Sequence, residues 1–231
     1  MQRSCKGGTS KSYGARKNPS ASGRRNRVVS NREHAWAPPQ AVEKLCETCH
    51  LIYRERMNLA AIPAFASKNV VHVIVEAPRG STLKLKYDPK WESMSVSRPL
   101  PLGVTFPFDW GFVPSTEGAD GDPLDALLLW DVPSYPGVVI PSRPIGVLQV
   151  EQNRTTSTPS ERIRNDRVLA IPVEARREHG ITDLAALPAR VRQELEQFTL
   201  AATALEGKDV RVVGWADAAA ALKLVQDSVT R

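Results

Sequence analysis

The chain of 231 residues is long enough for one domain with a sizeable hydrophobic core plus extensions, and nothing in its length requires two catalytic domains. It contains no apolar stretch of the length that a membrane span or a signal peptide needs, so we expect a soluble, cytoplasmic protein without a membrane partner. The formal net charge is +6, but residues 1–32 hold nine Lys or Arg and no acid, which leaves 6 − 9 = −3 for the remainder.

Residues 1–35 are predicted to form a basic, disordered tail. The segment is rich in Ser, Gly and Asn, and it has too few large apolar side chains to offset the entropy cost of ordering. Such a tail attracts nucleic acid without sequence specificity or serves organelle import. The alternative is a dispensable extension or a start codon placed too early. Nucleic acid is therefore a predicted partner only through this tail.

Residues 36–68 are predicted to be a short helical lead-in, with a helix over 41–57. Cys46, Cys49 and His50 formally match a c-type haem attachment motif. Haem attachment requires export, and no second pair of Cys or His stands at the spacing that would complete a zinc site. We interpret the two cysteines as reduced residues on a short helix, with a local redox pair as the alternative.

Residues 69–231 are predicted to be one domain, with short strands first and helices last. Strands are predicted at residues 70–76, 83–87, 93–97, 126–130, 145–151, 167–172 and 210–213. The first two, joined by a turn at 79–81, are predicted to form a hairpin. Helices are predicted over 187–205 and 216–229, and a polar loop without regular structure over 152–166. This order indicates an α+β fold, a small β-barrel with flanking C-terminal helices.

The segment at 120–126, Asp-Gly-Asp-Pro-Leu-Asp-Ala, places three carboxylates within six positions. Like charges this close raise each other's pKa, whereas a hard divalent cation such as Mg²⁺ reverses the sign of the interaction and prefers oxygen ligands. An EF-hand loop does not fit, because Leu124 and Asp125 stand where that loop needs an oxygen ligand and a glycine. The alternative is a solvated Asp-Gly turn. The aromatic segment 106–114 and the apolar run 124–130 pin the turn against a core, which favours the metal site.

These segments resemble the soluble inorganic pyrophosphatases of family I. The signature Asp, small or polar, Asp, Pro or Glu, apolar, Asp, apolar is matched throughout 120–126, and the likeness extends from about residue 69 to the C-terminus. Further matching segments are Val-Glu-Ala-Pro-Arg-Gly-Ser at 75–81, Phe-Asp-Trp-Gly-Phe-Val-Pro at 108–114, Arg-Pro-Ile-Gly-Val-Leu at 143–148 and Val-Val-Gly-Trp at 212–215. The resemblance implies an OB-like barrel with flanking helices, a homo-oligomer, and Mg²⁺-dependent hydrolysis of pyrophosphate, with Mn²⁺ as an alternative metal.

The resemblance also implies roles for individual side chains. Asp122 would bind and deprotonate the water that attacks the substrate, while Asp120 and Asp125 hold metal ions. Glu76 matches a carboxylate that helps to hold a metal ion. The implied phosphate-binding residues are Lys84, Arg98 and Arg167. Taken singly, each of these charged residues is also an ordinary surface residue.

The chain departs from the family pattern at several catalytic positions. Lys86 stands where the family has a glutamate, and Gln152 and Asn165 stand where it has two aspartates of a metal-binding loop. Arg167 replaces a lysine, which keeps the charge and changes the donor geometry. The other changes are Phe106 and Trp110 in place of two tyrosines, and Ala202 and Thr203 in place of a phosphate-binding Tyr-Lys pair.

Two functions therefore compete. The first is Mg²⁺-dependent hydrolysis of pyrophosphate, which the intact acidic turn favours. The alternative is a catalytically impaired protein that binds a phosphorylated ligand through its basic residues, which the lost carboxylates favour because a multi-metal site needs charged ligands. Three acids in or beside the polar loop are predicted to offer replacement oxygens, namely Glu151, Glu161 and Asp166.

Overall fold

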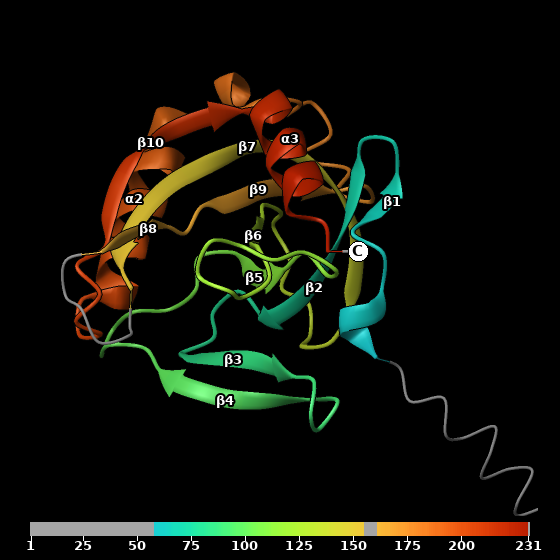
Figure 1. Cartoon of the computed structure of the whole chain (residues 1–231). Coiled ribbons are helices and arrows are strands. Elements are labelled where there is room, and N and C mark those ends of the chain that lie inside the picture. Colours follow the sequence, from blue (N-terminus) through green and yellow to red (C-terminus); the bar gives the residue numbers. More distant parts are fainter. Residues whose placement is uncertain (1–57, 155–160, 231) are drawn as a thin grey trace, which may run out of the picture. The chain divides into compact units, whose positions relative to one another are not determined.

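The computed structural model describes residues 58–154 and 161–230 (Figure 1). The predicted basic tail, the predicted helix over 41–57 and the Cys46, Cys49 and His50 motif lie outside these residues. The described elements are η1 (Leu59–Ala61), β1 (Phe65–Ser67), β2 (Val70–Ala77), β3 (Leu83–Asp88), β4 (Ser93–Pro99), β5 (Asp109–Phe112), β6 (Asp125–Leu128), β7 (Val139–Asn153), β8 (Arg162–Arg164), β9 (Arg167–Pro172), η2 (Leu184–Ala186), α2 (Ala189–Thr203), β10 (Arg211–Asp217) and α3 (Ala218–Ser228).

Most of the strands belong to one sheet, in which they pair in the order β1-β2-β5-β6-β9-β7-β10, with β8 also on β7. The long strand β7 pairs with β2 as well, so β2 pairs with β1, β5 and β7, and β7 pairs with β2, β8, β9 and β10. Strands β6 and β9 run parallel, and the other pairs are antiparallel. The fold is mostly β-sheet, with α2 and α3 as its two longer helices.

Strands β3 and β4 form a separate two-stranded sheet. The predicted hairpin between residues 70–76 and 83–87 is therefore wrong. Strand β2 is almost wholly buried and pairs with β1, β5 and β7, whereas β3 carries Lys84 and Lys86 and pairs with the exposed strand β4. Figure 1 shows β3 and β4 as a layer below the main sheet.

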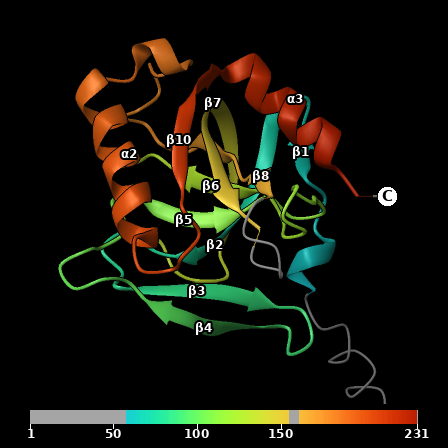
Figure 2. The ribbon, with the colours of Figure 1, turned by 60° about the vertical axis from the view of Figure 1, so that its left-hand side comes forward.

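The core lies against the main sheet, on both of its faces. Leu127, Leu148 and Leu169 pack with Leu195 and Phe198 of α2 on one side. The second apolar group is formed by alternate residues of β2, β6 and β9 with Val225 of α3. Figure 2 shows α2 beside β10 and α3 over the end of the sheet, so the two helices cover different parts of it.

The predicted loop over 152–166 is partly wrong. Strand β7 continues to Asn153, and β8 at Arg162–Arg164 pairs back onto it, with Glu151 opposite Arg164. The sequence shows no apolar alternation here because charged side chains face one another across this pair. Strand β10 also runs further than predicted, to Asp217, which caps α3 by accepting a hydrogen bond from the amide of Ala220 at 2.8 Å.

In the ranges that the structure describes, no helix is both long enough and apolar enough to cross a membrane.

Candidate active site

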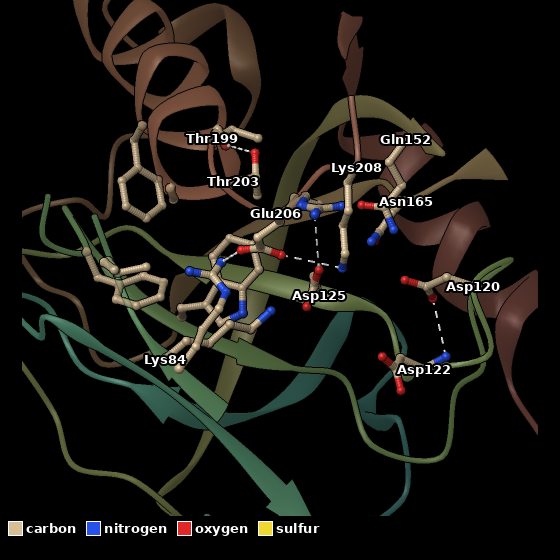
Figure 3. A pocket seen from close by; sticks show the side chains of 17 residues that line it. Lys84, Asp120, Asp122, Asp125, Gln152, Asn165, Thr199, Thr203, Glu206 and Lys208 are labelled. Carbon is tan, nitrogen blue, oxygen red and sulfur yellow. Dashed lines mark hydrogen bonds and ion pairs between the residues drawn. The ribbon is translucent and has the colours of Figure 1, made fainter. Parts of the chain in front are cut away.

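Two adjoining pockets between the main sheet and the β3–β4 sheet form one cleft, with about 600 and 1190 Å³ of space free of protein atoms. The residues that line both pockets are Lys84, Arg98, Asp122, Asp125, Glu206 and Lys208. Asp120 and Arg167 line the first pocket and Glu76 lines the second. The structure therefore brings all seven predicted site residues to one cleft, much of which is drawn in Figure 3.

The acidic loop between β5 and β6 is shaped by its own backbone. The amide of Gly118 donates to the carbonyl of Asp122 at 2.7 Å, and the amide of Gly121 donates back to Gly118 at 3.0 Å. Gly121 has a φ of 84°, in the left-handed region where a side chain would be strained. The amide of Asp122 donates to Asp120 Oδ1 at 3.2 Å. These hydrogen bonds fix the conformation of the loop, and its three aspartates, Asp120, Asp122 and Asp125, line the cleft.

The stem of this loop is held by the end of the chain. The amide of Glu117 donates to the carbonyl of Ser228 at 2.8 Å, and the amide of Thr230 donates to the carbonyl of Ser115 at 2.9 Å. Thr116 and Val229 form an isolated antiparallel bridge between these two bonds. The position of the acidic loop therefore depends on residues that follow α3.

Two carboxyl groups of the cleft have raised pKa values. Burial raises the pKa of Glu76 to about 7, although the Tyr87 amide, which donates to Oε1 at 2.8 Å, opposes the shift. Burial is also the main cause that raises the pKa of Asp120, and the charges of Asp125 and Asp122 add to it. A nearby cation would favour the charged form of both groups.

One ammonium group lies among these acids. Lys86 Nζ donates to Asp122 Oδ1 at 2.6 Å. Partial burial lowers the pKa of Lys86, but the hydrogen bond and charge of Asp122, with the charges of Glu76 and Asp125, outweigh burial and raise that pKa overall. The lysine is therefore held in its charged form beside the predicted catalytic base.

The basic side of the cleft is built around Trp110. The Lys84 ammonium and the Arg167 guanidinium lie 5.4 and 5.5 Å from the centre of its ring. Arg167 is only 4% exposed, and its Nη2 lies 3.5 Å from Asp125 Oδ2. Its Nε and Nη1 are buried and have no hydrogen-bond partner among the described residues. A buried guanidinium with unused donors fits the oxygens of an anionic ligand.

Arg98 is engaged by a residue that the sequence interpretation missed. Its guanidinium forms an ion pair with Glu206, which also lies 3.6 Å from Lys208 Nζ. Glu206 and Lys208, both labelled in Figure 3, belong to the short connection between α2 and β10, and Glu206 links this connection to Arg98 of β4. The only sequence signal for them is a pair of charges between a predicted helix and a predicted strand, which is common on surfaces.

The substituted positions Gln152 and Asn165 line the first pocket, as do Ala202 and Thr203. Gln152 is buried, and the Thr203 hydroxyl donates to the helix carbonyl of Thr199 at 2.8 Å. The hydroxyl proton is thus used within α2, so this position does not offer the cleft the donors of a Tyr-Lys pair.

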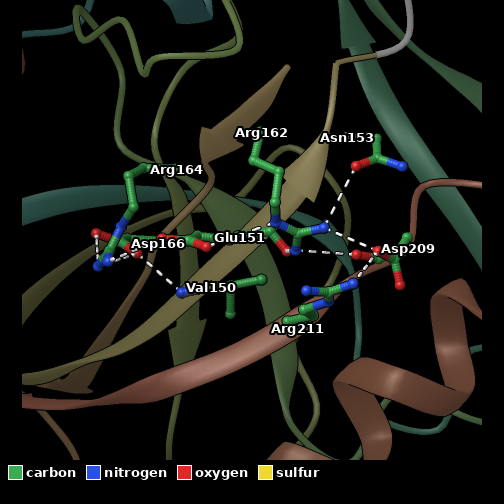
Figure 4. A network of polar contacts seen from close by, with 8 residues as sticks. All are labelled: Val150, Glu151, Asn153, Arg162, Arg164, Asp166, Asp209 and Arg211. Carbon is green, nitrogen blue, oxygen red and sulfur yellow. Dashed lines mark hydrogen bonds and ion pairs between the residues drawn. The ribbon is translucent and has the colours of Figure 1, made fainter. Parts of the chain in front are cut away.

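The acids predicted to replace the missing carboxylates are paired with arginines instead, as Figure 4 shows for Glu151 and Asp166. Glu151 lies 3.5 Å from Arg162, and Asp166 lies 2.9 Å from Arg164 and accepts from the Val150 amide at 2.9 Å. Glu161 lies 3.1 Å from Arg154. None of the three acids lines the cleft as the described residues form it, so a role as replacement ligands would require them to leave these arginines.

The described residues contain no group of three or more His, Cys, Asp or Glu side chains arranged so that they could hold a metal ion. The carboxylates of the acidic loop line one cleft without converging. One physical reason is their mutual repulsion, and another is that Lys86 already occupies an oxygen of Asp122.

Comparison with known proteins gives consistent results. A model of the inorganic pyrophosphatase family matches residues 73–231. The inorganic pyrophosphatase of Thermus thermophilus is 38% identical over 178 residues, which are 75% of this chain and 97% of the relative. That of a Synechocystis species is 32% identical over 173 residues, or 75% of this chain and 98% of the relative.

Solved structures agree with these sequence matches. The crystal structure of the Thermus thermophilus inorganic pyrophosphatase aligns with a TM-score of 0.68 at 37% identity, covering 74% of this chain and 97% of the other. The structure of an inorganic pyrophosphatase from Coxiella burnetii aligns with a TM-score of 0.66 at 32% identity, covering 73% and 98%.

Proposed function

The chain belongs to the inorganic pyrophosphatase family, and we propose that its cleft hydrolyses inorganic pyrophosphate to two phosphates with Mg²⁺ as the cofactor and Mn²⁺ as an alternative metal. The family resemblance inferred from the sequence is thus confirmed. The observation that carries the proposal is the arrangement of one cleft, in which an acidic loop faces the buried Arg167 and several half-buried basic groups. The relatives favour hydrolysis over the alternative of a binding protein without turnover.

The acids of the cleft are of the chemical type that a hard divalent cation takes as ligands, but as the described residues stand they do not converge on one point, so binding would have to draw them together. We propose Asp120, Asp125 and Glu76 as its ligands, because carboxylate oxygens are what Mg²⁺ prefers. The raised pKa values of Asp120 and Glu76 support this assignment, since a cation would offset the cost of ionising them. When bound, such an ion neutralises charge on the substrate and makes a water molecule more acidic.

The basic groups are proposed to bind and orient the substrate. Arg167 has unused donors inside the first pocket, and the nearby Lys84 ammonium lies over the same tryptophan ring. Arg98 is proposed as a third phosphate contact, which requires its guanidinium to share or leave Glu206. These three cations would offset the negative charge that accumulates on the phosphate that leaves.

Asp122 is proposed as the general base. Its Oδ1 accepts a hydrogen bond from Lys86, so we propose that Oδ2 accepts a proton from the attacking water. The water oxygen forms a bond to one phosphorus, the bridging P–O bond breaks, and the second phosphate leaves with its electron pair. Pyrophosphate and one water thus give two phosphates.

Four further assignments, on the scaffold, the oligomeric state, the location and a second partner, belong to the same proposal. The return pairing of β7 with β2 supports an OB-like barrel as the scaffold. A homo-oligomer and a cytoplasmic location are proposed from the family resemblance. Nucleic-acid contact through residues 1–35 stays a prediction from their charge.

The test is release of inorganic phosphate from pyrophosphate in the presence of Mg²⁺. We expect Asp122→Asn to lower the rate at least ~100-fold, the scale of a lost general base. The matched control is Asp131→Asn, an exposed aspartate paired with Arg177 outside the cleft, which should keep the wild-type rate. A wild type no faster than Asp122→Asn would refute hydrolysis by this site.

A further inference from the structure

The acidic part of the cleft contains a cation supplied by the chain itself. Lys84 and Lys86 are two positions apart on β3 and therefore share one face of the strand. Their ammonium groups have different surroundings, since Lys84 lies over the ring of Trp110 and Lys86 bonds to Asp122. Among the described hydrogen bonds and ion pairs, Lys86 contacts the acidic loop and Lys84 does not, so the two lysines have different tasks.

The contact between Lys86 and Asp122 contributes little to folding stability. The side chains of the pair are 45% and 57% exposed, and ion pairs this accessible to water add little to the free energy of folding. What the contact does change is the charge that the second pocket offers to a ligand. Glu76, Asp122 and Asp125 line that pocket together with Lys86.

We propose that Lys86 is a built-in cation of the substrate site, which takes the place of a divalent ion beside Asp122 and lowers the number of metal ions that the site binds. Its ammonium stands 2.6 Å from an oxygen that a metal ion would otherwise use. A fixed positive charge there also repels a second cation close by. This inference rests on the proposed function, because it concerns the metal ions of the same site.

The neighbouring residues support this assignment. Gln152 and Asn165, which line the first pocket, offer neutral amides where acids would attract further cations. Glu151 and Asp166, the adjacent acids, are held by Arg162 and Arg164. The described part of the cleft thus carries less negative charge than it would with acids at residues 152 and 165. The ammonium of Lys86 reduces the negative charge further at Asp122. For the reaction, the ammonium would stabilise negative charge on the substrate without any metal uptake.

The test is the metal stoichiometry of the full-length protein without pyrophosphate, measured by Mn²⁺ titration with calorimetry and electron paramagnetic resonance. We expect Lys86→Glu to bind one Mn²⁺ more per chain than the wild type. Lys86→Met, which removes the charge and keeps the length, should bind Mn²⁺ roughly tenfold more tightly because the repulsion is lost. Lys86→Arg keeps the charge and should match the wild type.

The matched control is Lys90→Met, which removes the same charge from an exposed position in the turn of the same two-stranded sheet. It should leave Mn²⁺ binding unchanged. Wild-type stoichiometry and affinity in both Lys86→Glu and Lys86→Met would overturn the inference, provided that circular dichroism shows both variants folded. Lys86→Met keeps the test decisive if the glutamate variant does not fold.

A second readout separates this inference from the proposed function. In the wild type, the rate of phosphate release should rise with Mg²⁺ concentration less steeply than in Lys86→Glu, because fewer ions take part. A wild type that binds Mn²⁺ and releases no phosphate would refute the function, and the metal count would still decide the role of Lys86. An active wild type with an unchanged metal count in the variants would refute the role of Lys86 alone.

Discussion

Glu76 and Arg167 show two opposite uses of burial in one cleft. Glu76 is 5% exposed and accepts a hydrogen bond from the Tyr87 amide, and burial raises its pKa to about 7, so a nearby cation would favour its ionised form. Arg167 is buried as well, but it stays charged and keeps donors unused. The acid is therefore prepared for a cation and the arginine for an anion, as binding of a metal–phosphate complex requires.

The pKa of Glu76 makes the stability of the metal-free protein depend on pH. The group releases its proton near 4.5 when unfolded and near 7 when folded, so the folded state binds more protons between these values. The free energy of unfolding should therefore fall as pH rises from about 4.5 to about 7, by up to ~3 kcal/mol, and level off above. Urea denaturation with a chelator, at a series of pH values, measures this.

Glu76→Gln should remove that part of the pH dependence, because the amide does not titrate. Glu174→Gln, at an exposed glutamate, should retain it. A glutamine variant at residue 76 whose unfolding free energy still falls as steeply with pH would show that another group is responsible.

The gathering of the seven predicted residues around one cleft was predictable from the sequence, because the acidic turn and its companion segments occur in a characteristic order. Their partners were not. The bond between Lys86 and Asp122 joins residues 36 positions apart, and the pair of Arg98 and Glu206 joins β4 to the connection after α2. Such pairs depend on how strands and helices pack, which local patterns do not encode.

At the scale of the elements, most strands were predictable, including the exposed pair β3 and β4, but the short strands β1, β5 and β8 were not. The apolar runs of β2 and β9 define those strands in the sequence. Strand β5 has four residues and begins with Asp109, which is fully buried and satisfied by the Arg79 amide at 2.7 Å and the Trp130 ring N–H at 2.9 Å. An acidic residue normally indicates an exposed position, so the sequence of this segment does not show the run of buried apolar residues by which a strand is recognised.

Strand β5 also contains a glycine that the packing of two strands requires. A Cβ atom on Gly111 would lie 1.9 Å from the carbonyl oxygen of Ile74 in β2, where backbone cannot yield easily. Gly111→Ala should therefore lower the free energy of unfolding by ~3 kcal/mol or more, the upper range for overpacking. Thermal or urea denaturation followed by circular dichroism measures the change.

The control is Gly180→Ala, because a Cβ atom there meets nothing within 4 Å. It should change the stability by less than ~0.5 kcal/mol. Equal stabilities of the two variants would mean that β2 and β5 separate without cost, contrary to the close approach described here.

At the scale of the whole molecule, charge is distributed unevenly along the chain. Residues 1–32 carry nine positive charges, whereas the family match begins at residue 73. The residues proposed for hydrolysis all lie within the matched segment.

Deletion of residues 1–32 should therefore leave kcat and KM for pyrophosphate within about twofold, because this segment supplies none of the residues proposed for hydrolysis. Nucleic-acid contact, the alternative role of this segment, would appear as salt-sensitive retention on DNA that the deletion abolishes. A large rise in KM on deletion would show that the segment acts on the cleft.

The bonds that join residues 115–117 to residues 228–230 have a consequence for biosynthesis. A ribosome completes the acidic loop long before it adds the residues that hold the stem of that loop, because synthesis proceeds from the N-terminus. A nascent chain can therefore pair β2, β5 and β6 while its carboxylates are still loosely placed. The cleft acquires its final arrangement only when the end of α3 has left the ribosome, so a half-made chain should be unable to release phosphate.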